Sequence, residues 1–177
     1  MGSHLAALLA QRLDLTGVER VLDVGGGFGH YCLALRTISP SIRATALDRP
    51  EVVALTREQD TGLEFIAGDY LDSDYGGPHD LVLIANVLHQ EAGDRAARLI
   101  QRAAGALRTG GRLVVLDFSI DPHKEQQLVG ALFAINMRSF GDTHSEPEIR
   151  GWMEAAGLGR VERVDLSPMR WLIIGHR

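Results

Sequence analysis

Glycines at positions 25, 26, 27 and 29 follow an acidic residue, Asp23, in the segment VLDVGGGFG near the start of the chain. Glycine has no Cβ, so the backbone can turn tightly here and approach a bound ligand closely. Doubly wound α/β folds bind nucleotides at such turns, where a strand ends and a helix begins. The segment therefore predicts a nucleotide-type cofactor site.

The spacing of these glycines narrows the type of cofactor. A dinucleotide fingerprint, G-x-G-x-x-G, would place His30 at its last position, where a small residue is needed for close packing. The G-K-[ST] ending of a phosphate-binding P-loop does not follow the turn. Asp23, at the end of an apolar stretch, needs hydrogen-bond donors if it is buried. The ammonium group of an amino-acid-like cofactor would supply them, directly or through turn amides and water.

Two further acidic residues follow the next two apolar runs. Asp48 is placed to accept hydrogen bonds from both ribose hydroxyls, and a carboxylate there disfavours a 2′-phosphate. Asp69 can accept from the exocyclic amine of adenine, while Tyr70 packs on the ring. Each feature alone is typical of a turn, a helix cap or a solvated side chain. The three in order, each at the end of an expected strand, indicate a cofactor with ribose and adenine.

The elements that must position these residues can be read from the alternation of short apolar runs with helix-like stretches, which predicts a parallel α/β sheet. Helices are expected over residues 5–13, near Phe28, near Pro50, and from Asp94 to a stop at 109–111. The expected strands cover residues 20–24, 42–47, 63–67, 81–85 and 113–118.

The remainder of the chain changes character. A helical stretch over 123–139 and a loop with Gly141 and Asp142 precede a helix at 146–156. Two more strands are expected at residues 161–164 and 171–174. Their short connection suits a hairpin. The predicted fold is thus α/β, a doubly wound, Rossmann-like and mostly parallel seven-stranded sheet with an antiparallel final strand.

The amino-acid composition limits the classes of function that this chain can have. The chain has 177 residues, 45% of them hydrophobic, and a net charge of -5, which predicts one globular domain over residues 1–177. Its 18 lysines and arginines are scattered, so nucleic acid is not expected as a partner. One cysteine, Cys32, and no membrane-length apolar run or signal segment predict a cytoplasmic setting without membrane attachment. Residues 1–4 resemble the remnant of a cloning tag.

Several segments together resemble class I S-adenosylmethionine-dependent methyltransferases, and most closely the catalytic domain of plant-type and polyketide small-molecule O-methyltransferases. The D-x-P-x-V-V and V-L-H patterns narrow the resemblance to that group. The resemblance implies S-adenosyl-L-methionine as cofactor, S-adenosyl-L-homocysteine as product and a small-molecule acceptor. The segments are VLDVGGG at 21–27, DRPEVV at 48–53, FIAGDY at 65–70, VLH at 87–89, GGRL at 110–113 and AAG at 155–157.

The resemblance also implies residue roles. His89 matches the general base of the family, and Asp117 matches a glutamate that orients this base. A histidine suits proton removal from a phenolic or enolic hydroxyl near neutral pH. The residues expected to contact the cofactor are Asp23, Gly25, Gly27, Asp48, Arg49, Asp69, Tyr70 and Asn86.

The chain departs from the family at several points. Ala85 replaces a cofactor-contacting lysine, Gln90 and Glu91 replace Asp-Trp, and Thr143 or a neighbour stands where a second orienting glutamate is common. The helical dimerisation domain that precedes the catalytic domain in relatives has no counterpart in this sequence. The resemblance still allows a homodimer.

Other residues remain open between structural and functional roles. No metal is expected, because His30, His79, His123 and His144 lack ligand spacing, and His144 is expected to be exposed. The apolar stretch within 128–140 suits a lid over the acceptor or plain core, whereas Trp152 and Trp171 are expected in the core.

Other functions remain open on the same fold. One is a C- or N-methyltransferase in which His89 is incidental, and another is a noncatalytic cofactor-binding module. A nicotinamide oxidoreductase is disfavoured by His30 in the glycine turn.

Overall fold

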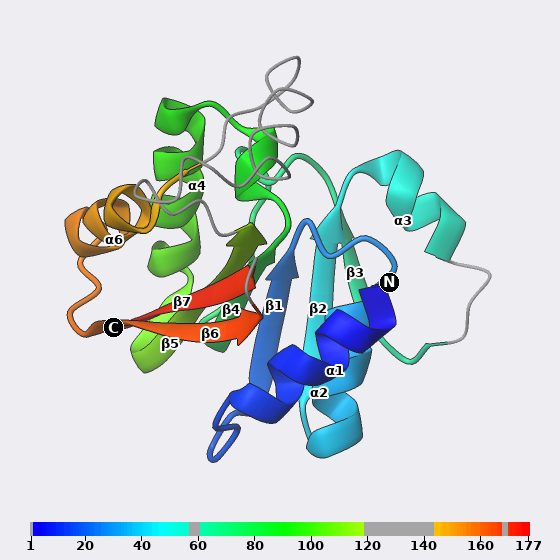
Figure 1. The fold of residues 1–177 in the computed structure, drawn as a ribbon. Helices are drawn as coiled ribbons and strands as arrows, with labels where there is room; N and C mark the ends of the chain where they lie inside the picture. The colour runs from blue at the N-terminus through cyan, green and yellow to red at the C-terminus, as the bar shows by residue number, and fades with distance from the viewer. Residues whose placement is uncertain (1, 57–60, 119–143, 168–169) are drawn as a thin grey trace.

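A computed structural model describes residues 2–56, 61–118, 144–167 and 170–177. In these ranges the strands form one seven-stranded sheet in the order β3-β2-β1-β4-β5-β7-β6 (Figure 1). The predicted α/β fold class is confirmed. The strands are β1 Arg20–Val24, β2 Arg43–Asp48, β3 Glu64–Ala67, β4 His79–Ala85, β5 Leu107–Phe118, β6 Val161–Ser167 and β7 Arg170–His176.

Strand direction follows the prediction. The first five strands pair in parallel, and β7 runs antiparallel to both of its neighbours, β5 and β6. The final strand of the chain lies inside the sheet, between β5 and β6, so that β6 forms the edge. The chain order reverses between β1 and β4, and doubly wound sheets bind their ligands at the carboxyl side of such a switch point.

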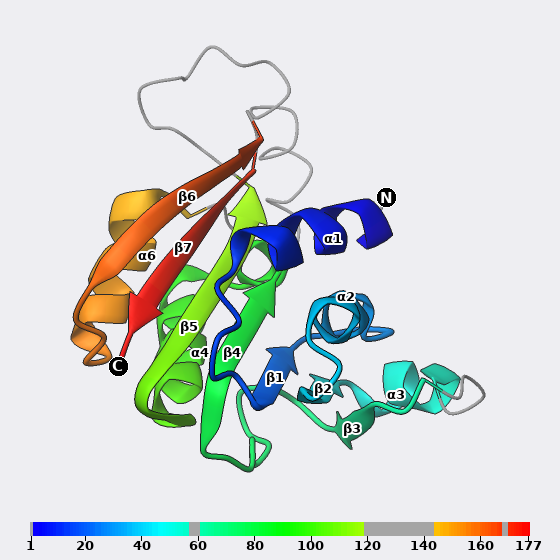
Figure 2. The ribbon, with the colours of Figure 1, turned by 90° about the horizontal axis from the view of Figure 1, so that it is seen from below.

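Helices cover both faces of the sheet. One face carries α1 and α2, and the opposite face carries α4 and α6 (Figures 1 and 2), while α3 lies beside β2 and β3. Every residue of β4 is buried, as expected for a central strand covered on both sides. No helix in the described part of the chain is long and apolar enough to cross a membrane. The helices are α1 Gly2–Arg12, α2 His30–Ile38, α3 Pro50–Thr56, the 3₁₀ turn η1 Leu88–Gln90, α4 Gly93–Gly105 and α6 Glu146–Ala155.

The prediction was wrong where α4 meets β5. The helix ends at Gly105, and β5 begins at Leu107, so residues 109–111 belong to the strand and not to a helix stop. Gly110 does have the left-handed backbone, with a φ of 77°, but it lies where the register between β4 and β5 shifts. Backbone pairing with β4 therefore overrides the local glycine signal. The helix expected at 123–139, the loop with Gly141 and Asp142, and Thr143 lie outside the described residues.

Asp80 joins the start of β1 to β4. Its Oδ2 accepts the backbone N–H groups of Glu19 and Arg20, each at 2.7 Å, and Arg108 donates to its Oδ1. Burial alone would raise the pKa of this carboxyl, but the pKa is lowered because the arginine and the two amides outweigh it. We expect Asp80→Ala to lower the free energy of unfolding by about 2–3 kcal/mol, measured by urea denaturation.

The matched control is Asp72→Ala, which removes an exposed ion pair with Arg98. This control should change stability by less than about 0.5 kcal/mol. Equal losses in the two variants would contradict the role given to Asp80.

Candidate active site

The glycine turn after β1 has the geometry that its sequence predicted. Gly25 and Gly27 have left-handed backbones, with φ values of 72° and 56°. The N–H groups of Gly25 and Gly26 donate to the carbonyl of Leu47 at 2.8 and 3.1 Å. A Cβ on Gly25 would lie 2.5 Å from Cγ2 of Val87. The turn is therefore packed between β2 and the segment that follows β4.

Asp23 is a buried carboxylate beneath this turn. The residue is 1% exposed, and neither of its side-chain oxygens has a hydrogen-bond partner among the described residues. Burial, with a smaller contribution from Asp48, raises the pKa of Asp23 to about 7. An unpartnered buried carboxylate is costly, so it calls for a ligand that brings a positive charge or donors. The ammonium group of an amino-acid-like cofactor fits this requirement.

Gly26 packs directly against Asp23. A Cβ there would lie 2.9 Å from both Cγ and Oδ2 of Asp23, and 3.0 Å from Cβ of Ala46. We expect Gly26→Ala to displace the carboxylate and to weaken binding of S-adenosylhomocysteine by roughly 10–100-fold in calorimetry. Gly105→Ala is the control, because a Cβ there meets nothing within 4 Å. Unchanged affinity in a folded Gly26→Ala variant would show that the carboxylate does not serve the ligand.

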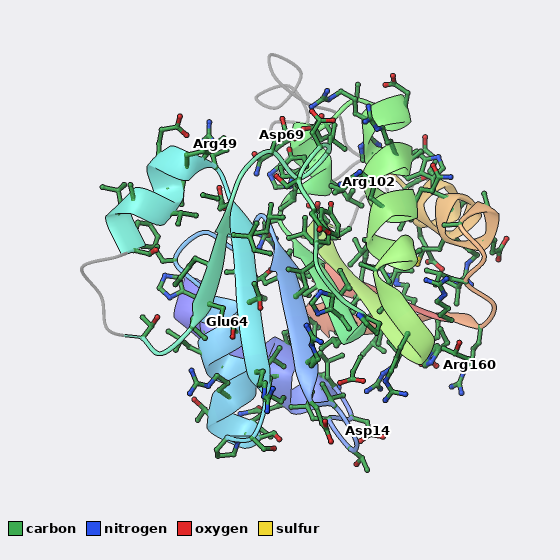
Figure 3. All side chains as sticks on the ribbon, turned by 180° about the vertical axis from the view of Figure 1, so that it is seen from behind. Asp14, Arg49, Glu64, Asp69, Arg102 and Arg160 are labelled. Atoms are coloured by element: carbon green, nitrogen blue, oxygen red, sulfur yellow. The ribbon has the colours of Figure 1, made fainter. Side chains whose placement is uncertain are left out.

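Asp48 ends β2 beside the glycine turn. Its Oδ2 accepts the N–H of Gly27 at 2.8 Å, and its Oδ1 accepts the N–H of Arg49 at 2.7 Å. Figure 3 shows Arg49 and Asp69 at the same end of the sheet, opposite the end where Asp14 lies. The strand ends thus bring the predicted cofactor-binding residues to one edge.

Asp69 and Tyr70 follow β3. Asp69 is exposed, and its Oδ1 accepts the N–H of Leu71 at 2.7 Å. The Tyr70 hydroxyl donates to the buried carboxylate of Glu91, which also accepts from Arg95. Burial and Glu91 both raise the pKa of Tyr70, so its hydroxyl stays protonated. Glu91, one of the departures from the family pattern, therefore positions the Tyr70 ring.

His89 and Asp117 form a hydrogen-bonded pair at the carboxyl edge. Nδ1 of His89 lies 2.7 Å from Oδ1 of Asp117, and the backbone N–H of His89 donates to Oδ2 at 3.2 Å. The His89 side chain is 12% exposed and that of Asp117 is 6% exposed. A carboxylate at this distance favours the tautomer of a neutral histidine ring that carries its proton on Nδ1. The pair has the arrangement of an oriented general base.

His144 is buried, which corrects the expectation that it is exposed. Its Nε2 lies 3.2 Å from the carbonyl oxygen of Leu88 and 3.0 Å from that of Glu91, on either side of His89. Its ring meets Trp152 edge-on, with centroids 4.9 Å apart. His144 therefore holds the η1 turn that carries His89. Sequence reasoning missed this role because its partners are backbone carbonyls, which leave no residue-type signal.

Asn86 lies between β4 and His89 at the same edge. Its amide hydrogen-bonds Tyr31 on α2 and Arg170 on β7, and neither partner was singled out in the sequence. The expected core position of Trp171 is confirmed at 1% exposure, and Trp152 packs half-buried against the core.

Comparisons with known proteins identify the family of this chain. A family model described as an O-methyltransferase domain matches residues 4–159. The chain belongs to the O-methyltransferase family. This O-methyltransferase domain is of the S-adenosylmethionine-dependent class, and S-adenosylmethionine is its cofactor, as the resemblance predicted.

Individual relatives are similar along most of the domain. It is 30% identical over 90% of its length to 3-hydroxy-5-methyl-1-naphthoate 3-O-methyltransferase of Streptomyces sahachiroi, and covers 48% of that protein. It is 32% identical over 89% of its length to the mitomycin biosynthesis 6-O-methyltransferase of Streptomyces lavendulae, of which it covers 46%. This O-methyltransferase domain thus spans about half the length of the curated relatives it matches.

A solved structure is similar as well. The O-methyltransferase family 2 protein from Planctomyces limnophilus, in complex with apigenin, is 33% identical, with a TM-score of 0.86. The match covers 97% of this domain and 57% of that chain.

Proposed function

We propose that the protein transfers the methyl group of S-adenosylmethionine to a phenolic or enolic hydroxyl of a small molecule, with His89 as the general base. The observation that carries this proposal is the contact of 2.7 Å between His89 and Asp117 at the edge that also bears the glycine turn. The relatives named above support it, since one is named as a hydroxynaphthoate 3-O-methyltransferase and one as a mitomycin biosynthesis 6-O-methyltransferase, and a similar solved structure holds apigenin.

Each residue has a chemical task in this proposal. The bound cofactor supplies a methyl group that its sulfonium has already activated. Asp23 pairs with the ammonium group of the cofactor, and Asp48 accepts hydrogen bonds from the ribose hydroxyls. Asp69 accepts a hydrogen bond from the adenine amine, and Tyr70 packs on the adenine ring. The turn with Gly25 and Gly27 lets the backbone approach the cofactor. We also assign contacts with the cofactor to Arg49 and Asn86.

The acceptor is activated by proton removal. Nε2 of His89 takes the hydroxyl proton as the oxygen acquires its new bond, and Asp117 stabilises the resulting imidazolium. Holding the acceptor oxygen in line with the carbon–sulfur bond that breaks lowers the activation free energy further. In well-oriented reactions this effect reaches about 7–11 kcal/mol. We further propose that residues 1–177 act as one cofactor-binding domain.

Two measurements test the proposal. Calorimetry should show binding of S-adenosylhomocysteine with a Kd well below about 1 mM. A panel of hydroxynaphthoates, flavones, catechols and aromatic amines is incubated with S-adenosylmethionine. Products in which one methyl group has replaced a hydrogen should form only where a hydroxyl is present. Absence of binding would overturn the cofactor site, whereas products methylated only on nitrogen or carbon would overturn the role of His89.

A further inference from the structure

Helix α4 carries three arginines that face the segment following β3. Arg95, Arg98 and Arg102 are spaced by three and four residues, so they lie on one face of the helix. Arg98 and Arg102 bind residues 69–75 directly, and Arg95 binds Glu91, which holds the same segment (Figure 3). Residues 69–75 form neither helix nor strand. The position of this segment therefore depends on α4.

Arg102 binds two carbonyls of a tight turn in this segment. Its Nε donates to the carbonyl of Tyr70 at 3.2 Å, and its Nη2 donates to the carbonyl of Ser73. Within the turn, the carbonyl of Asp69 accepts the N–H groups of Asp72 and Ser73 at 3.1 and 2.8 Å. A planar guanidinium donates to two acceptors in one fixed geometry. Arg102 thus fixes the backbone of the turn from the side of α4.

Tyr75 supplies a second donor to one of these carbonyls. Its hydroxyl donates to the carbonyl of Tyr70 at 2.6 Å, and the centre of its ring lies 5.0 Å from Cζ of Arg102. Tyr75 is buried, and burial raises the pKa of its hydroxyl to about 12, so the hydroxyl stays protonated. The carbonyl of Tyr75 lies 2.9 Å from Nε2 of His79 at the start of β4. Two donors from well-packed side chains therefore hold the Tyr70 carbonyl.

The turn determines how the carboxylate of Asp69 is presented. Asp69 is exposed, its Oδ1 accepts the N–H of Leu71 at 2.7 Å, and its Oδ2 has no hydrogen-bond partner among the described residues. Leu71 is buried in the core, which anchors the turn on the side of the sheet. The direction of Oδ2 is therefore set by the backbone that Arg102 and Tyr75 hold.

We propose that Arg102, supported by Tyr75, is a positioning residue that holds Asp69 in the orientation that accepts a hydrogen bond from the exocyclic amine of adenine. This inference rests on the adenine contacts of the proposed function. It makes Arg102 a determinant of selectivity for adenine over a base without that amine. Arg102 exerts this effect through the turn and not through a contact of its own with the base.

The test compares two ligands that differ only in the base. S-adenosylhomocysteine carries the amine, whereas S-inosylhomocysteine carries a carbonyl oxygen there, which cannot donate to a carboxylate. In calorimetry the wild type should bind the first about 10–100-fold more tightly than the second. Arg102→Gln should weaken binding of S-adenosylhomocysteine by about 10–30-fold. It should weaken binding of S-inosylhomocysteine by less than about 3-fold, because this ligand makes no such bond with Asp69.

Two further variants separate the contributions to the preference for the adenine ligand. Tyr75→Phe keeps the ring and removes one donor, so the preference should fall by about 3-fold. This variant loses a single hydroxyl and keeps the test possible if Arg102→Gln does not fold. Arg102→Lys retains the charge but cannot donate to both carbonyls in the same geometry, so it should restore only part of the preference.

Arg98→Gln is the matched control on the same helix and the same turn. Arg98 is 57% exposed, and its hydrogen bonds go to the carbonyl of Leu71 and to the exposed Asp72. Its replacement should change the preference by less than about 2-fold. A loss in Arg98→Gln equal to that in Arg102→Gln would overturn the specific role of Arg102. Equal weakening of both ligands by Arg102→Gln would show a residue that merely supports the fold, and would also overturn the proposal.

The wild type distinguishes failure of this proposal from failure of the proposed function. If the wild type binds neither ligand, the cofactor site itself fails. If it binds both with equal affinity, Asp69 does not recognise the amine, and the adenine contact fails together with the role of Arg102. If the wild type prefers S-adenosylhomocysteine and Arg102→Gln keeps that preference, the inference about Arg102 alone is wrong.

Discussion

Replacing His89 by glutamine is expected to lower kcat for methyl transfer to a phenol by about 10²–10⁴-fold. Glutamine can still donate to Asp117, which lies 2.7 Å from Nδ1 of His89, but it cannot take a proton from the acceptor. The residual rate should rise with pH, because ionisation of the acceptor then replaces the missing base. The measurement is kcat as a function of pH on an acceptor for which the wild type is active.

The binding of S-adenosylhomocysteine is the internal control for this variant, and it should change by less than about 2-fold. His176→Gln, at the opposite end of β7, is the matched substitution and should leave kcat unchanged. An unaltered rate and pH profile in His89→Gln would show that His89 is not the base. A parallel loss of cofactor affinity would show instead that the side chain supports the fold of the edge.

Replacing Asp23 by asparagine is expected to stabilise the cofactor-free protein while damaging its binding site. The folded state raises the pKa of this carboxyl from 3.8 to about 7. The unfolded chain therefore releases the proton near pH 4 and the folded protein only near pH 7, so stability falls as the pH rises between these values. Above pH 7 the full cost applies, on the order of 4 kcal/mol, and asparagine removes it.

Urea denaturation of the cofactor-free protein at pH 5 and pH 8 measures this effect. The wild type should lose stability between the two values, and Asp23→Asn should lose much less. The same variant should weaken S-adenosylhomocysteine binding by about 100-fold, with methylthioadenosine affinity nearly retained, since only the former carries the ammonium group. If the stability of the two proteins depended on pH in the same way, Asp23 would not be a buried carboxylate that lacks a partner. Asp14→Asn, at the opposite end of the sheet, is the control (Figure 3).

Much of the fold could be predicted because its signals are local. The spacing of apolar residues predicted β1 with its observed bounds. It predicted the bounds of most other strands to within two residues. The start of β5 was missed because residues 107–112 carry glycines and arginines, which no strand pattern favours, yet their backbone pairs in the sheet. Pairing with β4 and β7 decided that segment.

The sequence by itself determined the glycine turn and the acidic residues at successive strand ends, because parallel strands bring their carboxyl ends to one edge. It did not determine that Asp23 finds no hydrogen-bond partner among the described residues, that His144 holds the turn bearing His89, or that Arg170 reaches Asn86. These features depend on how deeply each side chain is buried. They also depend on which backbone or side-chain groups, distant in the sequence, come into contact in the folded chain. Residue type and spacing predict which groups reach the edge of the sheet, but only tertiary packing decides which of them find partners inside the protein and which remain for a ligand.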